Sequence, residues 1–230
     1  MSDIPESRAI AERYARRTGG DRYSAMNPEV LRGLHERQEA MCRIFERNGW
    51  RDLSGLRLFE VGCGTGGNLL ELLRLGFKPE NLSGIELLPE RWAEARHVLP
   101  GALDVQEGDA TTCACAPASQ DIVFVSTVFS SLLDHAYQES LAAAMWRWTK
   151  PGGGVLWYDF IVDNPANADV RGVPVRRIRS LFPEGTVRAR RVTLAPPLAR
   201  AVSAVSPGLY TLLNAFPMLR THVLAWVAKA

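Results

Sequence analysis

Hydrophobic and polar positions follow two different patterns along the chain. Before residue 50, apolar residues recur at helical spacing, and Leu31, Leu34, Met41 and Phe45 share one face of a predicted helix over 28–47. From residue 56, short apolar runs alternate with helical stretches. The change predicts a helical N-terminal segment followed by an α/β region.

The short apolar runs have the length and composition of buried strands. Predicted strands cover residues 56–61, 82–86, 102–106, 121–125, 155–160, 188–194 and 221–228. Helices are predicted between the early strands, from apolar stripes such as Leu141, Met145 and Trp148. The P-G-G-G segment at 151–154 predicts a turn before the fifth strand. This alternation favours an open, mostly parallel sheet with helices on both faces.

Length and charge narrow the organisation of the chain. With 230 residues, the sequence suits one large domain with a small lobe, and we expect an N-terminal helical cap at 1–50 and a main domain at 51–230. The net charge of +2 does not by itself indicate a nucleic-acid or membrane partner. The sequence leaves the oligomeric state open.

The cysteines and the termini point to a cytoplasmic protein without a metal. Cys42, Cys63, Cys113 and Cys115 form no C-x-x-C pair and lie at no metal-ligand spacing from a histidine, so we expect reduced thiols. The N-terminus has no apolar signal segment. The longest uncharged stretch, 201–219, is interrupted by proline and glycine, and no transmembrane segment is expected.

A glycine-rich loop, L-F-E-V-G-C-G-T-G-G-N at 58–68, joins the first predicted strand to a helix. Glycines at such a turn permit positive φ and close approach of a ligand, and the helix start offers free N–H groups. The G-x-G-x-x-G spacing, with Glu86 about twenty residues on, also occurs in dinucleotide-binding folds. Residues 60–69 contain no basic side chain, which favours a cationic ligand over a phosphate.

The E-V-G-C-G-T-G loop resembles the E/D-x-G-x-G-x-G signature of class I S-adenosylmethionine-dependent methyltransferases. Glu86 is similar to the acid that binds both ribose hydroxyls in that family, and Asp109 in E-G-D-A to the acid that binds the adenine amino group. The resemblance covers residues 56–160. It implies a seven-stranded sheet of order 3-2-1-4-5-7-6 with strand seven antiparallel.

The same resemblance implies S-adenosylmethionine as cofactor, held at the carboxyl ends of the strands. The residues expected to bind it are Glu60, Gly62, Cys63, Gly64, Thr65, Gly66, Asn68, Glu86, Leu87, Asp109, Ala110, Ser126 and Thr127. We also expect the segment before residue 28 to act as a lid, with Tyr14 and Tyr23 over the cofactor. Alternatively, these tyrosines only anchor the following helix.

The acceptor side departs from the family pattern. Residues 127–132 read T-V-F-S-S-L where related small-molecule methyltransferases often carry N-V-L-H-H-L, so the histidine pair is absent. Asp159 and His135 are the candidate catalytic residues. A carboxylate paired with a nearby arginine and a surface histidine are the structural alternatives.

Methyl transfer to an oxygen of a small molecule is the expected function. No N/D-P-P-Y/F motif follows the fourth strand, so no nucleic-acid acceptor is expected. The C-terminal part loosely resembles bacterial methyltransferases from surface-polysaccharide gene neighbourhoods, which implies a sugar or nucleotide-sugar acceptor. A cofactor-binding partner subunit without turnover and a nucleotide-binding oxidoreductase are the alternatives.

Two segments of the C-terminal third remain open to more than one interpretation. Residues 171–200 contain eight arginines against Glu184 alone, which suits a phosphate-bearing substrate or a solvated positive face. The apolar segment beyond residue 192 is interpreted as core around a closing hairpin, with a lipid-facing patch as the alternative.

Overall fold

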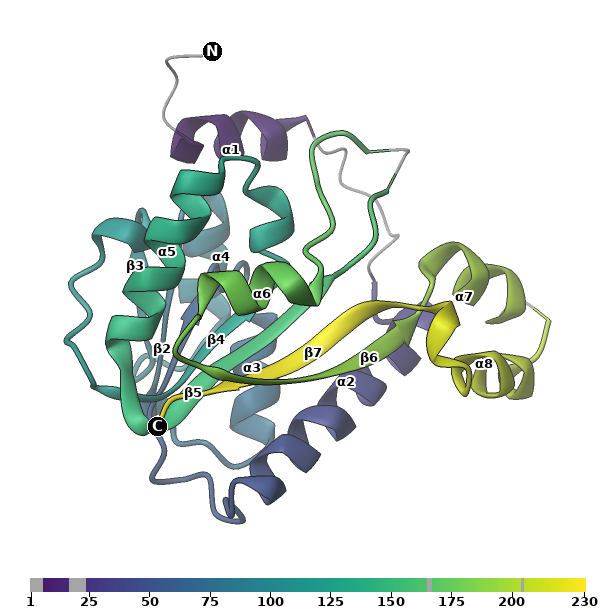
Figure 1. Ribbon diagram of the computed structural model, residues 1–230, viewed down its shortest axis with the longest axis horizontal. Coiled ribbons are helices and arrows are strands. Elements are labelled where there is room, and N and C mark those ends of the chain that lie inside the picture. Colours follow the sequence, from purple (N-terminus) through teal and green to yellow (C-terminus); the bar gives the residue numbers. More distant parts are fainter. Residues whose placement is uncertain (1–5, 17–23, 165–166, 204) are drawn as a thin grey trace.

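The computed structural model describes residues 6–16, 24–164, 167–203 and 205–230 (Figure 1). Its centre is one seven-stranded sheet in the order β3-β2-β1-β4-β5-β7-β6. The strands are β1 Leu58–Val61, β2 Leu82–Glu86, β3 Asp104–Glu107, β4 Gln120–Ser126, β5 Thr149–Phe160, β6 Thr186–Leu194 and β7 Arg220–Ala228. The strand order predicted from the sequence is confirmed.

The pairing directions also agree with the prediction. β1 is parallel to β2 and β4, and β4 is parallel to β5. β7 is antiparallel to both β5 and β6, so the sheet closes with a hairpin. Parallel neighbours end at the same edge, which brings the loops after β1, β2 and β4 together.

Helices cover both faces of the sheet (Figure 1). They are α1 Glu6–Ala15, α2 Pro28–Arg47, α3 Gly67–Arg74, α4 Pro89–Val98, α5 His135–Trp148, α6 Val175–Leu181, α7 Pro196–Ser203 and α8 Pro207–Asn214. One core cluster joins α5 and α6 to the sheet, and the other joins α2, α3 and α4 to its opposite face. Burial on both faces explains the continuous apolar sequence of β4.

The two predicted cap helices have different places. Met41 and Phe45 of α2 are buried in the same cluster as Leu58 of β1, so α2 is a layer of the main fold. Only α1 lies across the carboxyl ends of the strands (Figure 1). The part of the predicted cap that can cover a ligand is therefore α1 and not α2.

The prediction of a turn at 151–154 before the fifth strand is wrong. These residues belong to the long strand β5, with Gly152 at φ 78°. Gln120 pairs with Thr149 and Ile122 with Gly154, so the register shifts between them. The segment is therefore an irregularity inside a strand, and the positive φ of Gly152 occurs in glycine-containing bulges as well as in turns.

A second correction concerns the apolar segment between β6 and β7. It forms a helical hairpin, α7 and α8, that projects from one side of the molecule (Figure 1). Val205, Leu212, Phe216 and Met218 are exposed, so a buried core accounts for only part of this segment. Among the described residues, no helix is long and apolar enough to cross a lipid bilayer.

Candidate functional site

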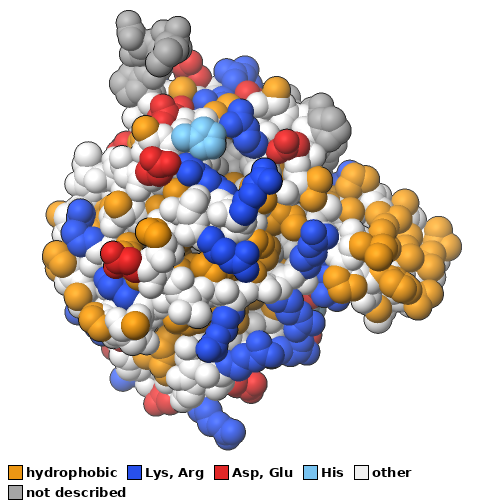
Figure 2. All heavy atoms as spheres, in the orientation of Figure 1, with side chains coloured by type: hydrophobic (Ala, Val, Ile, Leu, Met, Phe, Trp, Pro, Cys, Tyr) orange, Lys and Arg blue, Asp and Glu red, His pale blue; other side chains and the backbone are white. Residues whose placement is uncertain are grey.

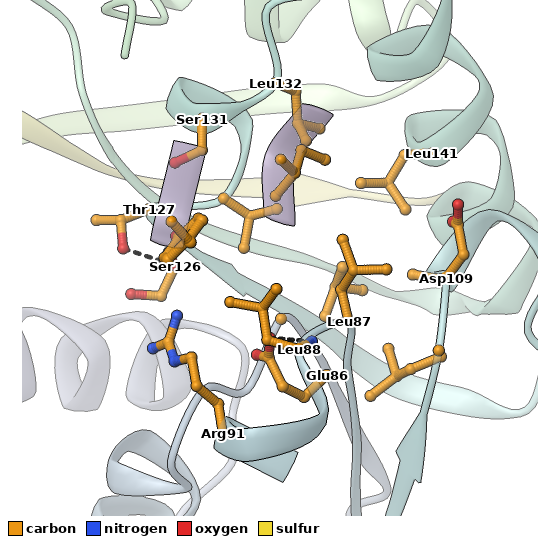
Figure 3. Close-up of a pocket in the computed structure, with 18 of the residues that line it drawn as sticks. Glu86, Leu87, Leu88, Arg91, Asp109, Ser126, Thr127, Ser131, Leu132 and Leu141 are labelled. Carbon is orange, nitrogen blue, oxygen red and sulfur yellow. Dashed lines mark hydrogen bonds between the residues drawn. The ribbon is translucent and has the colours of Figure 1, made fainter. Parts of the chain in front are cut away.

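A cleft opens at the carboxyl ends of β1, β2 and β4, with residues of α1 on its border. Its apolar lining includes Ile10, Leu87, Leu88, Val128, Leu132 and Leu141. Its polar lining includes Tyr14, Glu86, Arg91, Asp109, Ser126, Thr127, Ser131 and Tyr137. In Figure 3, Asp109 lies on one side of the cleft, Arg91, Ser126 and Thr127 lie on the other, and Glu86 lies between them.

The glycine loop is shaped for close approach. Gly62, Gly64 and Gly66 have φ values of 65°, 59° and 88°, which side chains other than glycine rarely adopt. A Cβ at Gly62 would lie 2.6 Å from Val128 Cγ2, and one at Gly64 would lie 2.5 Å from Arg91 Nη2. Any larger residue would occupy this space, so the loop needs glycine for both conformation and room.

Glu86 connects the end of β2 to the glycine loop. Its Oε2 accepts a hydrogen bond from the Gly64 amide at 2.8 Å, and its Oε1 accepts one from the Leu88 amide at 3.0 Å. The side chain is buried in the wall of the cleft. Each carboxylate oxygen can accept a further bond, so the residue can hold the loop and still accept from a ligand hydroxyl.

Asp109 has a structural role in the same wall. Its Oδ1 accepts hydrogen bonds from the Thr111 amide, the Thr111 hydroxyl and the Tyr137 hydroxyl, at 2.8, 2.7 and 2.7 Å. The residue thereby caps the 3₁₀ turn Ala110–Thr112. Burial, together with the bond to Asp109, raises the pKa of Tyr137 well above its ordinary value.

Glu60 lies behind the glycine loop and is fully buried. Its Oε1 accepts a hydrogen bond from Asn68 Nδ2 at 2.6 Å, while Oε2 has no hydrogen-bond partner among the described residues. Burial raises the pKa of Glu60 to about 8. A nearby ion pair joins Arg37 Nη2 to Glu71 Oε2 at 2.6 Å.

Arg91 and Tyr137 are cleft residues that the sequence did not predict. The Arg91 guanidinium lies 5.2 Å from the centre of the Tyr14 ring, beside Gly64. It places a positive charge next to a loop whose own sequence has none, which corrects the expectation of a site without basic groups. No sequence signal marks it, because an arginine in the first turns of a polar helix is usually at the surface.

Helix α1 is attached to the rim of the cleft. Glu6 Oε1 accepts hydrogen bonds from the Leu133 amide at 2.9 Å and from Arg13 Nη2 at 2.5 Å. Arg13 Nη2 also donates to the Ser131 carbonyl at 3.0 Å, and Ile10 is buried in the core. Tyr14 therefore has a defined place over the cleft, whereas Tyr23 and the rest of residues 17–23 lie outside the described residues.

The structure places neither candidate catalytic residue in the cleft wall. Asp159 is 1% exposed, and it accepts hydrogen bonds from the Ser130 amide at 3.0 Å and the Phe160 amide at 2.9 Å. Burial raises its pKa to about 7. His135 is exposed at the start of α5, with Nε2 3.4 Å from Arg171 Nη1. In these positions Asp159 supports the turn after β4, and His135 belongs to the surface.

Thr127 marks the end of β4 with an unusual backbone. Its φ is 54°, which is uncommon for a β-branched residue. Its amide donates to the Tyr158 carbonyl at 2.8 Å and its hydroxyl to the Ser126 carbonyl at 2.8 Å (Figure 3). Such backbone strain persists where the surroundings hold it and often lies at ligand sites.

The residues predicted to bind a cofactor separate into two groups. Those in the cleft wall are Tyr14, Gly62, Glu86, Leu87, Asp109, Ala110, Ser126 and Thr127. Those within or behind the glycine loop are Glu60, Cys63, Gly64, Thr65, Gly66 and Asn68. Cys63 is buried, and its amide donates to the Ile85 carbonyl at 3.1 Å. Their contacts with a cofactor stay predictions.

Residues 58–153 match the family model described as "Methyltransferase domain". The chain is 33% identical over 132 residues to phthiotriol/phenolphthiotriol dimycocerosates methyltransferase 1 of Mycobacterium ulcerans, covering 55% of this chain and 47% of that protein. A corresponding Mycobacterium tuberculosis enzyme is 29% identical over 154 residues, covering 64% and 55% of the two chains. The chain thus spans about half the length of the curated relatives it matches.

Among solved structures, the fold is similar to geranyl diphosphate C-methyltransferase from Streptomyces coelicolor A3(2) in complex with Mg²⁺, geranyl diphosphate and S-adenosyl-L-homocysteine. The TM-score is 0.69 with 13% sequence identity, and the similarity covers 100% of both chains. At this identity the likeness establishes the fold alone. Together with the strand order, it identifies the class I methyltransferase fold.

Proposed function

We propose that the protein transfers a methyl group from S-adenosylmethionine to a hydroxyl oxygen of a small molecule with an apolar body, which the match of residues 58–153 to the methyltransferase domain model supports. The observation that carries the proposal is the cleft itself. It combines a glycine cradle with two acids, Glu86 and Asp109, on neighbouring strand ends.

The order of polar groups along the cleft fits the cofactor. Asp109 with Ala110 suits the adenine at one side, Glu86 suits the ribose diol, and Arg91 suits the amino-acid carboxylate at the other side (Figure 3). Gly62 lines the cleft between these polar groups and places no side chain in it. An arginine pairs well with a carboxylate. The acids Glu86 and Asp109 can accept hydrogen bonds from the ribose hydroxyls and the adenine amino group.

When bound, S-adenosylmethionine supplies a methyl group on a positively charged sulfur. The protein's own task is to orient the acceptor oxygen and to exclude water. The Ser126, Thr127 and Ser131 side chains lie on one side of the cleft and can bind an acceptor hydroxyl (Figure 3). Helix α1 closes the rim above them through Ile10 and Tyr14.

An apolar acceptor agrees better with the cleft than a sugar. Ile10 and Leu132 line the cleft and offer no side-chain hydrogen bonds to a polyol. The mycobacterial relatives named above also act on dimycocerosates by their names, which are lipids. We therefore place the apolar acceptor ahead of the sugar acceptor.

Calorimetry with S-adenosylhomocysteine tests the cofactor site. A charge-assisted hydrogen bond contributes about 1.5 to 3 kcal/mol, so Glu86→Ala should weaken binding at least about tenfold. Glu86→Gln retains one acceptor oxygen and should show a smaller loss. The matched control, Glu90→Ala, removes an exposed acid from α4 and should bind like the parent protein. Equal affinity in folded Glu86→Ala would exclude Glu86 as the ribose ligand.

The acceptor is tested separately with methyl-labelled cofactor. The purified protein is incubated with three sets of compounds: hydroxylated lipids, prenyl alcohols and their diphosphates, and sugars with nucleotide sugars. Mass spectrometry then locates the added methyl group. We expect an O-methylated product in one of the first two sets. Methylated sugars alone would contradict the apolar acceptor, and cofactor binding without any product would favour the partner-subunit alternative.

A further inference from the structure

The hairpin between β6 and β7 presents large apolar side chains to solvent. We call residues 195–219 the apolar hairpin; it contains α7, α8 and the 3₁₀ turn Pro217–Leu219. The exposed fractions of Met218, Val205, Leu212 and Phe216 are 79%, 78%, 59% and 49%. Figure 2 shows the hairpin as a projection whose surface is largely hydrophobic. Contiguous exposed apolar surface of this kind usually marks an interaction site.

Packing inside the hairpin does not account for these side chains. The hairpin has its own small core, in which Ala199, Val202 and Tyr210 are buried against Leu194 of β6. It is also tied to the main fold. Arg32 Nη1 donates to the Ser203 hydroxyl at 3.2 Å, and Arg220 Nε donates to the Asn214 carbonyl at 2.8 Å. The small core and these hydrogen bonds therefore hold the hairpin in place, with the apolar residues named above exposed to solvent.

The charges carried by the hairpin and by the two strands that flank it have one sign, although the neighbouring helix α2 places Glu36 at 3.7 Å from Arg220. No acidic residue follows Glu184 in the sequence, so every charged side chain of the hairpin, β6 and β7 is basic. Arg200 is exposed on α7, and Arg188, Arg190 and Arg191 are exposed along β6, which leads into the hairpin. Figure 2 shows basic side chains on the face beside the apolar projection.

Arg188 and Arg190 also line a shallow groove between β6 and α2. Arg43 and Arg47 of α2 complete its basic border, and Leu224 and Trp226 of β7 form part of its apolar wall. Among these arginines, Arg43 pairs with Glu39 of its own helix. The basic surface thus continues from the hairpin onto the body of the protein, and it suits anionic headgroups.

We propose that the apolar hairpin and the adjoining arginines form a docking surface for an anionic lipid bilayer. Phe216 and Met218, at the turn where α8 leads into β7, enter the interface between headgroups and acyl chains, while Arg188, Arg190 and Arg200 face the headgroups. A second copy of the chain fits less well. Two hairpins in contact would bring two basic surfaces of the same sign together.

This inference goes beyond the proposed function, and its test needs neither cofactor nor acceptor. The full chain is sedimented with vesicles of phosphatidylcholine alone and with vesicles that also contain phosphatidylglycerol. We expect binding to the anionic vesicles that weakens as salt is raised, because salt screens exposed charges. The Phe216→Ser/Met218→Ser variant should bind about tenfold more weakly or worse. It lacks two large apolar side chains, and the free energy of transferring them from water into the bilayer no longer favours binding.

Matched variants separate the two components of the surface. Arg188→Gln/Arg190→Gln should lose the preference for anionic vesicles, while the control Arg147→Gln on α5 should retain it. Val98→Ser removes an exposed apolar residue of α4, 44% exposed, and should bind vesicles like the parent chain. Thermal melting and circular dichroism verify that each variant is folded.

Two results would overturn the proposal. One is equal vesicle binding by the parent chain and the Phe216→Ser/Met218→Ser variant, or no binding by either. The other is a dimer in size-exclusion chromatography that this variant dissociates, without vesicle binding by the parent chain. That second result would show that the hairpin is an interface between two copies of the chain.

Discussion

At the scale of single residues, three acids around the glycine loop have different environments. Glu86 lines the cleft and accepts two backbone hydrogen bonds. Asp109 accepts three bonds and caps a 3₁₀ turn. Glu60 accepts a single bond and lies in the buried layer behind the loop. The three carboxyl groups therefore have different roles: Glu86 is a candidate cofactor ligand, Asp109 caps a turn and Glu60 is a buried acid.

The raised pKa of Glu60 predicts how stability depends on pH. The native state retains a proton up to about pH 8 that the unfolded state releases near its ordinary value of 4.5, so the free energy of unfolding should fall as pH rises through this range. Asp159, with a pKa of about 7, acts in the same direction. His222, whose burial lowers its pKa to about 4 from 6.5, has the opposite effect, but only below pH 6.5.

Urea denaturation between pH 6.5 and 8 should therefore report the contribution of Glu60 and Asp159 to stability without that of His222. We expect the free energy of unfolding to fall by on the order of 1 kcal/mol per pH unit. Glu60→Gln should show a flatter profile, because the amide does not ionise. The control Glu90→Gln changes an exposed acid and should follow the parent profile. A Glu60→Gln profile as steep as the parent's would contradict the assignment of this proton to Glu60.

At the scale of elements, α1 is the part of the chain placed to act as a lid. Its buried residues Ile10 and Arg13 attach it to the turn after β4, and Tyr14 reaches the cleft from the same helix. The Arg91–Tyr14 contact joins α1 to α4 across the glycine loop. Closure by such an element excludes water and aligns the acceptor.

Tyr14→Ala should weaken S-adenosylmethionine binding without unfolding the domain. A tyrosine ring over the cofactor sulfonium contributes about 0.5 to 2 kcal/mol by cation–π attraction, which corresponds to roughly a twofold to thirtyfold change in dissociation constant. Glu12→Ala alters an exposed residue of the same helix and serves as the control. Bound ligand should also protect residues 15–25 from trypsin. Unchanged affinity in Tyr14→Ala, with no protection of that segment, would show that α1 only anchors the fold.

At the scale of the whole molecule, the parallel part of the sheet determines where the site can be. The loops after β1, β2 and β4 meet at one edge, and α1 joins them there although Glu6 and its partner Leu133 are 127 positions apart. A ligand that contacts all of these loops binds only the native state. Its binding should therefore stabilise the complete fold.

Thermal unfolding with two ligands tests this coupling and the cofactor class together. At about a hundred times the dissociation constant, a ligand adds about 2.7 kcal/mol, so S-adenosylhomocysteine should raise the melting temperature by roughly 5 to 10 °C for a domain of this size. NAD should leave it unchanged. A larger shift with NAD than with S-adenosylhomocysteine would support the oxidoreductase alternative. The shift should be reduced in Glu86→Ala and retained in Glu90→Ala.

The local and periodic features of this protein could be predicted from its sequence. The strands, the glycine loop and the acids at the ends of β2 and β3 follow from short apolar runs and from residues a few positions beyond them, while the strand order followed from the resemblance of these motifs to class I methyltransferases. These features depend on local backbone chemistry and on burial of both sheet faces, which leave direct signs in the amino-acid order.

Only the tertiary structure decided which side chains share the cleft and which apolar residues stay outside the core. Arg91 and Tyr137 reach the cleft from α4 and α5, whereas Asp159 turns into the interior to hold the Ser130 amide. The leucines and the Phe216–Met218 turn of the hairpin have the sequence pattern of a core, yet part of them faces solvent. The physical reason is that hydrophobicity predicts a tendency to be buried, but the available partners depend on contacts between segments far apart in the chain.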